Sequence, residues 1–319
     1  MVSGTERDMS NFLDRVRAAT ARAVQANAIF PIDTTVSVFR QPGTELDFVI
    51  RRVANLQRKP KATAPEGNQS ARPQNPFLPY DPDMFVENVS ETHVVLLNKF
   101  NVIEDHVLLV TRAFEPQSAL LTERDFDAVI RVLRRMDGVA FYNAGTLAGA
   151  SQFHKHLQVV PRLMPDQSER TPFCISIRAA MQNDSTGPLV VAGLDFEHVV
   201  EPVIIQSTED DCSADSSAAT LLSKYHSCLH ALEQRMNVLS DVDAQGATGI
   251  AQPFAYNLLL TREWMMVVPR SQEMFDDISV NSLGFAGALL VKNDPQLARV
   301  LQVTPMAILT AVGFLRQSS

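Results

Sequence analysis

The chain has 319 residues, of which 45% are hydrophobic and 20% are charged, and this balance excludes intrinsic disorder and collagen-like order. Its 28 Lys and Arg residues against 36 Asp and Glu residues give a net charge of −8, which argues against nucleic acid as a partner. No stretch approaches the ~18 uncharged apolar residues of a membrane span, and charges fill the opening segment where a secretory signal has an apolar core. We therefore expect a cytoplasmic protein with no membrane partner.

The N-terminal part is expected to cover a core built further along the chain. Apolar residues at helical spacing predict an opening helix, and extended stretches follow around residues 36–39 and 46–53. We assign residues 1–58 to this covering unit. The proline-rich run that follows, at residues 59–82, predicts a long surface loop.

Residues 83–170 carry the strongest secondary-structure signals. A hairpin is predicted from strands at residues 94–97 and 107–111. Thr122 with Asp125 three residues later predicts a helix start, and an apolar stripe continues to Met136 before Asp137-Gly138 ends it. Strands are then expected at residues 139–142 and 152–160.

The remaining chain divides into a connecting segment, residues 171–250, and a C-terminal half, residues 251–319. The connecting segment holds an acidic loop at residues 207–219 and a helix from about residue 220 to 238. A second hairpin, residues 256–260 and 265–269, resembles the first one. Either the fold contains two diverged copies of one α+β half, or the likeness reflects ordinary strand composition.

The most informative segment is Ser151-Gln152-Phe153-His154-Lys155-His156-Leu157-Gln158. Alternate side chains of a strand point to opposite faces, so His154, His156 and Gln158 are expected to share one face. The intervening apolar side chains are expected to pack behind the strand: Phe153, Leu157 and Val159. A neutral imidazole is a nucleophile without prior deprotonation, because its ordinary pKa is about 6.5. Phosphorus and acyl carbon are its natural targets.

Other histidine patterns have simpler interpretations. Zinc binding through His154 and His156 would need two further ligands that no neighbouring residue offers at suitable spacing. His226 and His230, four apart on a predicted helix, are interpreted as surface or packing residues. Trp264 is interpreted as a core residue rather than a stacking surface for adenine.

The wider pattern carries a resemblance. Asn143-x-Gly145 followed by Ser151-Gln152-x-His154-Lys155-His156-Leu157-Gln158 is similar to the histidine-triad superfamily, in the branch where glutamine replaces the third histidine. Further segments resemble the fungal-type ATP adenylyltransferases, also called diadenosine tetraphosphate phosphorylases: Asn75-Pro76-Phe77-Leu78-Pro79-Tyr80, Leu97-Asn98-Lys99-Phe100, Asn257-Leu258-Leu259-Leu260-Thr261 and Asn281-Ser282-Leu283-Gly284.

The resemblance implies an α+β fold with a histidine-triad-like antiparallel sheet, flanking helices and two diverged half-domains. It also implies a reversible reaction in which His156 attacks diadenosine tetraphosphate, releases ATP and holds AMP until phosphate takes it as ADP. His154 would orient His156 or protonate the leaving oxygen, while Ser151 and Gln158 would bond phosphoryl oxygens. Gln158 cannot change charge, which favours phosphate over water as the acceptor.

The same resemblance assigns substrate contacts along the chain. They are Lys59, Asn98, Lys99, Asn143, Gly149, Ala150, Gln152, Asn281, Ser282, Leu283, Ala288 and Lys292. Ala288 stands where the family carries methionine, which puts adenine selectivity in question. The expected partners are a dinucleoside polyphosphate, ATP, ADP and phosphate. No cofactor motif is present, so we expect Mg²⁺ to arrive bound to the substrate. We also expect the enzyme to be a monomer.

Two alternatives stay open. A hydrolase of the histidine-triad superfamily would share the Asn-x-Gly and His-x-His pattern, and would release AMP independently of phosphate. A nucleotide-binding sensor without turnover would use the acidic loop as a partner surface. Activity is expected to fall on the acid side of neutrality, as His156 becomes protonated.

Overall fold

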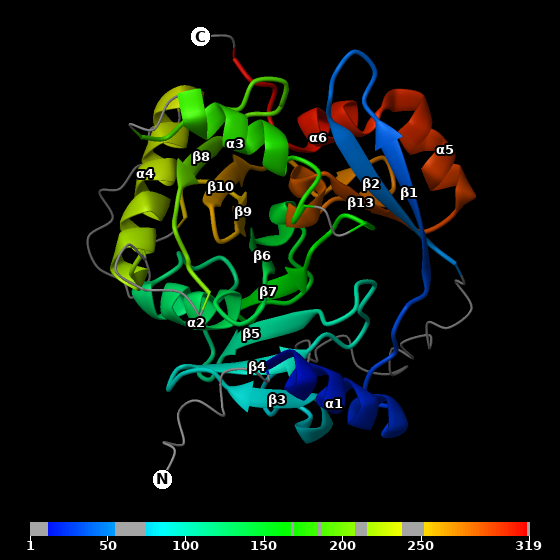
Figure 1. Cartoon of the computed structure of the whole chain (residues 1–319), viewed down its shortest axis with the longest axis vertical. Helices are drawn as coiled ribbons and strands as arrows, with labels where there is room; N and C mark the ends of the chain where they lie inside the picture. The colour runs from blue at the N-terminus through cyan, green and yellow to red at the C-terminus, as the bar shows by residue number, and fades with distance from the viewer. Residues whose placement is uncertain are drawn as a thin grey trace, which may run out of the picture.

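We analysed a computed structural model, which describes residues 12–54, 75–166, 169–183, 187–207, 216–237 and 252–317. An eight-stranded antiparallel sheet forms its centre (Figure 1). In spatial order its strands are β3 (Phe85–Asn88), β4 (His93–Leu97), β5 (Val107–Thr111), β7 (His156–Pro161), β6 (Gly138–Ala144), β9 (Tyr256–Leu260), β10 (Trp264–Pro269) and β8 (Val199–Pro202).

Both predicted hairpins belong to this one sheet. The first is β4–β5 and the second is β9–β10, and the pairing of β6 with β9 joins the halves of the chain. Asn143 lies opposite Asn257 in that pairing. Residues of the C-terminal half therefore reach the same region as the histidine segment.

Two layers cover the sheet. On one face, the first core packs α1 (Phe12–Gln25), α2 (Glu123–Leu133) and α4 (Ala218–Met236) against side chains such as Leu157 and Val159. A second core on the other face includes residues of α3 (Cys174–Asn183), α5 (Asp294–Val303) and α6 (Pro305–Val312). A smaller sheet joins this second layer, with β1 (Thr34–Arg40) antiparallel and β13 (Ala288–Val291) parallel to β2 (Asp47–Val53).

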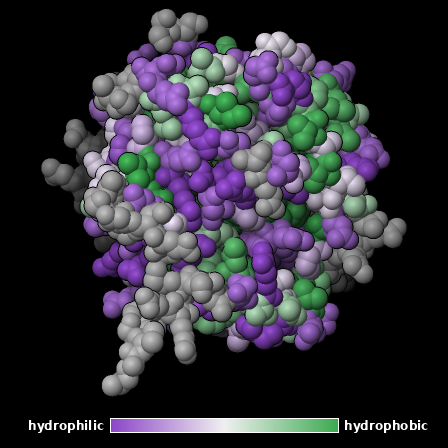
Figure 2. Space-filling model, in the orientation of Figure 1, coloured by the Kyte–Doolittle hydropathy of each residue, from purple (hydrophilic) through white to green (hydrophobic). Residues whose placement is uncertain are grey.

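Short elements complete the chain in the described ranges. They are the 3₁₀ helices η2 (Pro82–Met84), η3 (Thr146–Ala148) and η5 (Ser282–Ala286), and the two-stranded sheet of β11 (Met274–Phe275) and β12 (Ile278–Ser279). The face shown in Figure 2 is largely hydrophilic, with separate hydrophobic patches. Within the described ranges, no helix combines the length and the apolar character that crossing a membrane requires.

Most of the predicted elements are confirmed, with two corrections. Helix α2 begins at the predicted capping box of Thr122 and Asp125, but it ends at Leu133, before Met136. Strand β7 begins at His156 rather than at Gln152, because residues 151–155 leave the sheet except for an isolated bridge between His154 and Pro116. Trp264 is fully buried, as expected.

A buried ion pair fixes the back of the histidine segment. Lys155 lies between His154 and His156 in sequence, and its ammonium group contacts Asp125 of α2 at 2.7 Å and Glu115 at 3.0 Å. The Lys155 and Asp125 side chains are 0% and 1% exposed, and His93 binds the other oxygen of Asp125 at 3.0 Å. Burial by itself would raise the pKa of Asp125, but the bonds from His93 and Lys155 lower it to about 2. The segment is therefore tied to α2 through charge.

This pair predicts a large stability loss in Asp125→Ala. The substitution strands the buried ammonium of Lys155, which should lower the free energy of unfolding by about 3–5 kcal/mol. Asp127→Ala on the same helix is the matched control, since Asp127 pairs with Arg131 on the surface and should matter by less than about 1 kcal/mol. Urea unfolding of both variants measures the difference. Equal losses of unfolding free energy in the two variants would show that the buried ion pair stabilises the protein no more than the surface pair does.

Candidate active site

The two histidines and Gln158 lie on the sheet face opposite the α1, α2 and α4 layer. In strand register Gln158 lies beside Leu108, and His156 lies beside Val110. The ring of Phe77 covers both histidines, with ring centroids 5.6 Å from His154 and 5.3 Å from His156. The predicted shared face is thus present, and the described part of the proline-rich run, from residue 75, builds one side of it.

Two expectations about this region were wrong. Of the surface loop predicted for residues 59–82, residues 59–74 lie outside the described residues; within the described part the prediction is wrong at Phe77, which is only 6% exposed because it packs on the histidine rings. Phe153 was expected to pack behind the strand, but it is 63% exposed, because residue 153 precedes β7 and does not follow its alternation. Lys155 occupies the buried side instead.

The ring of His156 presents a bare nitrogen. Its Nδ1 lies 2.9 Å from the backbone oxygen of His154, and this contact is a hydrogen bond only if Nδ1 carries the proton. Burial lowers the pKa of His156 to about 4, although the bond to the His154 carbonyl acts in the opposite direction. The neutral ring therefore holds its proton on Nδ1 and keeps the Nε2 lone pair free for attack.

The ring of His154 is fixed at both nitrogens. Its Nε2 donates to the backbone oxygen of Thr111 at 2.8 Å. Its Nδ1 accepts from the Asn75 amide at 2.9 Å, since the Asn75 oxygen already accepts the backbone N–H of Phe77. Burial lowers the pKa of His154 as well. This arrangement supports an orienting role for His154 over the alternative of a proton donor to the leaving oxygen.

Gln117 fixes the backbone of His156. Its side-chain oxygen accepts the backbone N–H of His156 at 2.8 Å. Its amide nitrogen donates to the backbone oxygens of Asn143 at 3.0 Å and His156 at 3.2 Å. The buried Gln117 amide therefore ties the start of β7 to the end of β6.

A directional chain of hydrogen bonds orients Gln158. The backbone N–H of Phe100 can only donate, and it binds the Asn98 side-chain oxygen at 3.1 Å. The Asn98 amide nitrogen then faces the ring of His106, 3.2 Å from Nδ1 and 3.5 Å from Nε2. Nε2 of His106 lies 3.0 Å from the Gln158 side-chain oxygen, which can only accept, so His106 carries its proton on Nε2. The –NH₂ group of Gln158 is thereby directed away from His106.

Burial keeps this chain neutral. It lowers the pKa of His106 to about 4, opposed by the hydrogen bond to Gln158 and aided by the nearby His156. His106 is therefore uncharged near neutral pH and holds one proton in a fixed position. Asn98, assigned to substrate contact by the resemblance, lies against the ring of His106.

A second polar cluster connects the two halves of the chain. The side-chain oxygen of Asn143 accepts from the Asn257 amide at 2.9 Å and from the backbone N–H of Ser282 at 3.0 Å. The Asn257 oxygen in turn accepts from Arg270 at 2.6 Å. Arg270 is 2% exposed and also binds backbone oxygens, including that of Val280 at 2.9 Å. Asn143 and Ser282, both predicted substrate contacts, are thus bonded to each other inside the protein.

Gly149 brings the loop before the histidines against η5. Its φ of +86° favours glycine, and a Cβ at this position would lie 2.9 Å from the backbone oxygen of Val280. Asn281 begins η5, where its side-chain oxygen accepts the backbone N–H of Leu283 at 3.0 Å. The close approach places two of the predicted substrate segments side by side.

A cavity of about 340 Å³ opens at this contact, within the size range of small-ligand sites. Five predicted substrate contacts line it: Gly149, Asn281, Leu283, Ala288 and Lys292. Val102 and Ile103, from the loop between β4 and β5, close another side. The same loop also carries Asn98 and His106, which lie beside Gln158.

The other predicted contacts do not line this cavity or lie outside the described residues. Lys99 is exposed, with its ammonium group 6.0 Å from the ring of Phe30. Ser151 is also exposed, while Ala150 and Gln152 are half-buried. Lys59 lies outside the described residues. Their assignments stay predictions.

Several functional residues were not identified from the sequence. Asn75 was noticed only as part of a family segment, and nothing in the local pattern marks Gln117 or Arg270 as polar hubs. His106 directly precedes the strand predicted at residues 107–111. That position could have indicated that His106 lies near a neighbouring strand, but it does not indicate the bond from His106 to Gln158. His226 and His230 are exposed on α4, as interpreted.

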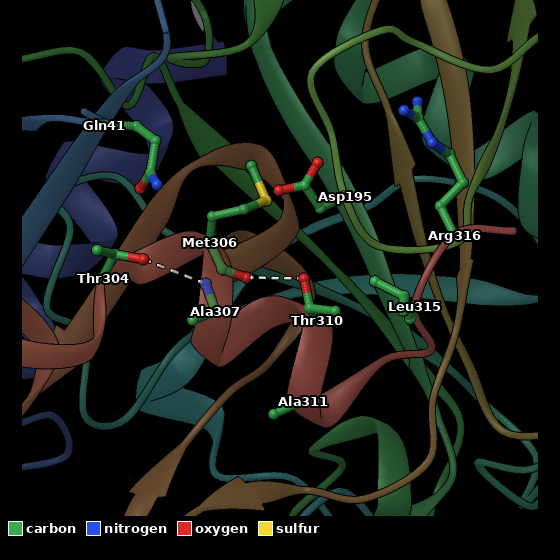
Figure 3. Close-up of a pocket in the computed structure, with 9 residues that line it drawn as sticks. All are labelled: Gln41, Asp195, Thr304, Met306, Ala307, Thr310, Ala311, Leu315 and Arg316. Atoms are coloured by element: carbon green, nitrogen blue, oxygen red, sulfur yellow. Dashed lines mark hydrogen bonds between the residues drawn. The ribbon is translucent and has the colours of Figure 1, made fainter. Parts of the chain in front are cut away.

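A further cavity of about 650 Å³ lies over α6 (Figure 3), and none of the predicted site residues lines it. The hydroxyl groups of Thr304 and Thr310 in this cavity are bonded within α6. Over the described ranges, no group of three or more His, Cys, Asp or Glu side chains is arranged as metal ligands would be.

Comparisons with known proteins identify the family of the chain. The sequence model of the Ap4A phosphorylase N-terminal domain matches residues 4–179, and that of the ATP adenylyltransferase C-terminal domain matches residues 192–315. Protein APA1 of Saccharomyces cerevisiae is 29% identical over 297 residues, covering 89% of this chain and 88% of its own. Diadenosine 5',5'''-P1,P4-tetraphosphate phosphorylase 2 of the same yeast is 28% identical over 284 residues, covering 82% of each chain.

The fold has solved relatives too. Yeast Ap4A phosphorylase Apa2 in complex with Ap4A has a TM-score of 0.73 and 24% sequence identity, over 97% of this chain and 99% of its own. Its complex with AMP gives the same TM-score, identity and coverage. The two-domain histidine-triad-like α+β fold is confirmed. The first family model matches more than half of this chain. The chain therefore belongs to the Ap4A phosphorylase family.

Proposed function

We propose that the chain phosphorolyses diadenosine tetraphosphate reversibly, giving ADP and ATP, through an AMP group held on His156. The observation that carries the proposal is the free lone pair of His156 Nε2 on a neutral ring. The family membership supports the substrate and the reaction type.

In the first step the Nε2 lone pair forms a bond to the α-phosphorus. The bond from that phosphorus to its bridging oxygen breaks, and ATP leaves with the electron pair. The positive charge that develops on the ring is stabilised by the His154 carbonyl, which accepts from Nδ1 throughout. In the second step an oxygen of inorganic phosphate attacks, ADP leaves and the lone pair returns to Nε2.

Gln158 stabilises the transferring group as a hydrogen-bond donor. Its –NH₂ group is directed by His106, and a carboxamide neither gives nor takes a proton at neutral pH. Water needs a base to attack, whereas a phosphate dianion is already ionised. This difference favours phosphate over water as the acceptor.

A divalent cation, and Mg²⁺ in particular, is proposed to arrive bound to the polyphosphate, where it offsets charge on the leaving ATP. The enzyme is further proposed to act as a monomer in the cytoplasm. The acidic composition supports a single soluble chain, and sedimentation of the purified protein tests the monomer directly.

Phosphate dependence tests the reaction. With diadenosine tetraphosphate and inorganic phosphate, we expect ADP and ATP in equal amounts, and no turnover when phosphate is omitted. Ion-exchange separation of the nucleotides measures both. AMP with ATP at a rate indifferent to phosphate would instead identify a hydrolase, and binding without any turnover would identify a sensor.

The sequence predicted that activity falls on the acid side of neutrality, as for an ordinary histidine, and the lowered pKa of His156 moves that expected fall to a more acidic pH. Because the pKa of His156 is lowered to about 4, the ring stays about nine-tenths neutral at pH 5, so the single-turnover rate should stay level from pH 7 to about 5 and fall near pH 4. Return to pH 7 must restore the rate, which separates titration from unfolding. A half-loss near pH 6.5 would contradict the buried, neutral nucleophile.

The hydrogen-bond chain predicts that Asn98→Asp reverses the orientation of the Gln158 amide. A carboxylate at this position still accepts from Phe100 and presents a second acceptor to the His106 ring, nearest to Nδ1. It should draw the His106 proton from Nε2 to Nδ1. Nε2 then becomes an acceptor, so the Gln158 amide nitrogen turns toward His106 and its oxygen toward the phosphoryl group. We expect kcat to fall at least about tenfold, corresponding to one lost donor in the transition state.

Two variants control for this change. Asn98→Ala removes the direction of the chain without adding charge, and should show a smaller fall in kcat. Glu104→Gln alters an exposed charge in the same loop and should leave kcat unchanged. Steady-state kinetics of all three decide the question, and an unaltered kcat in Asn98→Asp would remove the orienting role of the chain.

A further inference from the structure

Arg51 lies in the wall of the cavity and has no acidic partner among the described residues. It lies on β2 beside Leu290 of β13, and its Nε atom is buried with no hydrogen bond. No ion pair among the described residues involves Arg51, whereas its neighbour Arg52 binds Asp294 at 2.6 Å. Burial lowers the pKa of Arg51 from its ordinary value, yet a guanidinium remains protonated at neutral pH. A half-buried charge without an acidic partner costs stability unless a ligand compensates it.

The charge around this cavity is positive. Arg51 and Lys292 both line it, and the one carboxylate in its wall, that of Glu273, accepts from the Ser279 hydroxyl at 2.9 Å. The rest of the lining is largely apolar, including Val102, Ile103 and Leu283, as suits a nucleoside. Two cations at the edge of an apolar cavity match the chemistry of a nucleotide.

We propose that Arg51, with Lys292, binds a phosphate group of the dinucleoside polyphosphate in this cavity. The proposal rests on the proposed function for the identity of the anion. A guanidinium offers two parallel N–H donors to phosphate oxygens, which gives both charge and direction. Arg51 therefore extends the substrate-contacting set beyond the positions that the family pattern assigned.

The position of Arg51 indicates which step it serves. The lining of the cavity includes Gly149 but no residue of β7, so Arg51 contacts a part of the substrate away from the reacting phosphorus. Interactions remote from the reacting atoms that are equally strong in ground and transition states change KM and leave kcat unaltered. Loss of Arg51 should accordingly raise KM alone.

Direct binding tests the proposal without turnover. Calorimetric titration of the full chain with ATP and with adenosine separates phosphate contact from base contact. Arg51→Gln should weaken ATP binding about tenfold and leave adenosine binding unchanged, the expected loss of one charge-assisted contact. Arg51→Lys keeps the charge without the planar fork and should lose less.

Arg52→Gln is the matched control and should bind ATP as the wild type does. Circular dichroism checks the fold of each variant, and Arg51→Met, which keeps an apolar stem, replaces Arg51→Gln if that variant is unfolded. Unchanged ATP binding in the neutral variants overturns the proposal, and so does an equal loss for adenosine, which would assign Arg51 to the base. Arg51-dependent ATP binding in a protein that does not turn over diadenosine tetraphosphate would refute the proposed function but keep this site.

Discussion

The candidate site depends first on one hydrogen bond, from Nδ1 of His156 to the backbone oxygen of His154. It determines which nitrogen carries the proton, and hence which one keeps its lone pair. Gln117 holds the backbone of His156, and Lys155 ties the same segment to α2 from behind. The geometry of one imidazole thus depends on contacts on both sides of the sheet.

The direction of the surrounding hydrogen bonds follows from backbone N–H groups that can only donate. Phe77 fixes the amide of Asn75, and Phe100 fixes the amide of Asn98. The Asn75 nitrogen then faces Nδ1 of His154, whose proton lies on Nε2 and is accepted by the Thr111 carbonyl. The Asn98 nitrogen faces the ring of His106, whose proton lies on Nε2 and is accepted by the Gln158 oxygen. Two asparagines in similar local turns thereby contact two buried histidines, one beside His156 and one beside Gln158.

Strand alternation predicted the shared face of His156 and Gln158, and the capping box predicted the start of α2. These features are local, because each is determined by residues that are close together in the sequence. The orienting roles of Asn98, His106 and Gln117 depend on side chains brought together from distant segments, which no local pattern states. Phe153 and Phe77 were misjudged because the chain leaves the sheet before β7 and a loop residue folds back over the rings. The substrate contacts came from family likeness alone, and that likeness did not include Arg51, which only the cavity made visible.

The most direct measurement is the site of attachment of AMP. The enzyme would be incubated with diadenosine tetraphosphate in the absence of phosphate, kept above neutral pH because phosphoramidates hydrolyse in acid, and analysed by ³¹P NMR and peptide mass spectrometry. The structure predicts one AMP group, bonded to Nε2 of His156. Attachment at Nδ1, at another residue or at none would contradict the tautomer on which the mechanism depends.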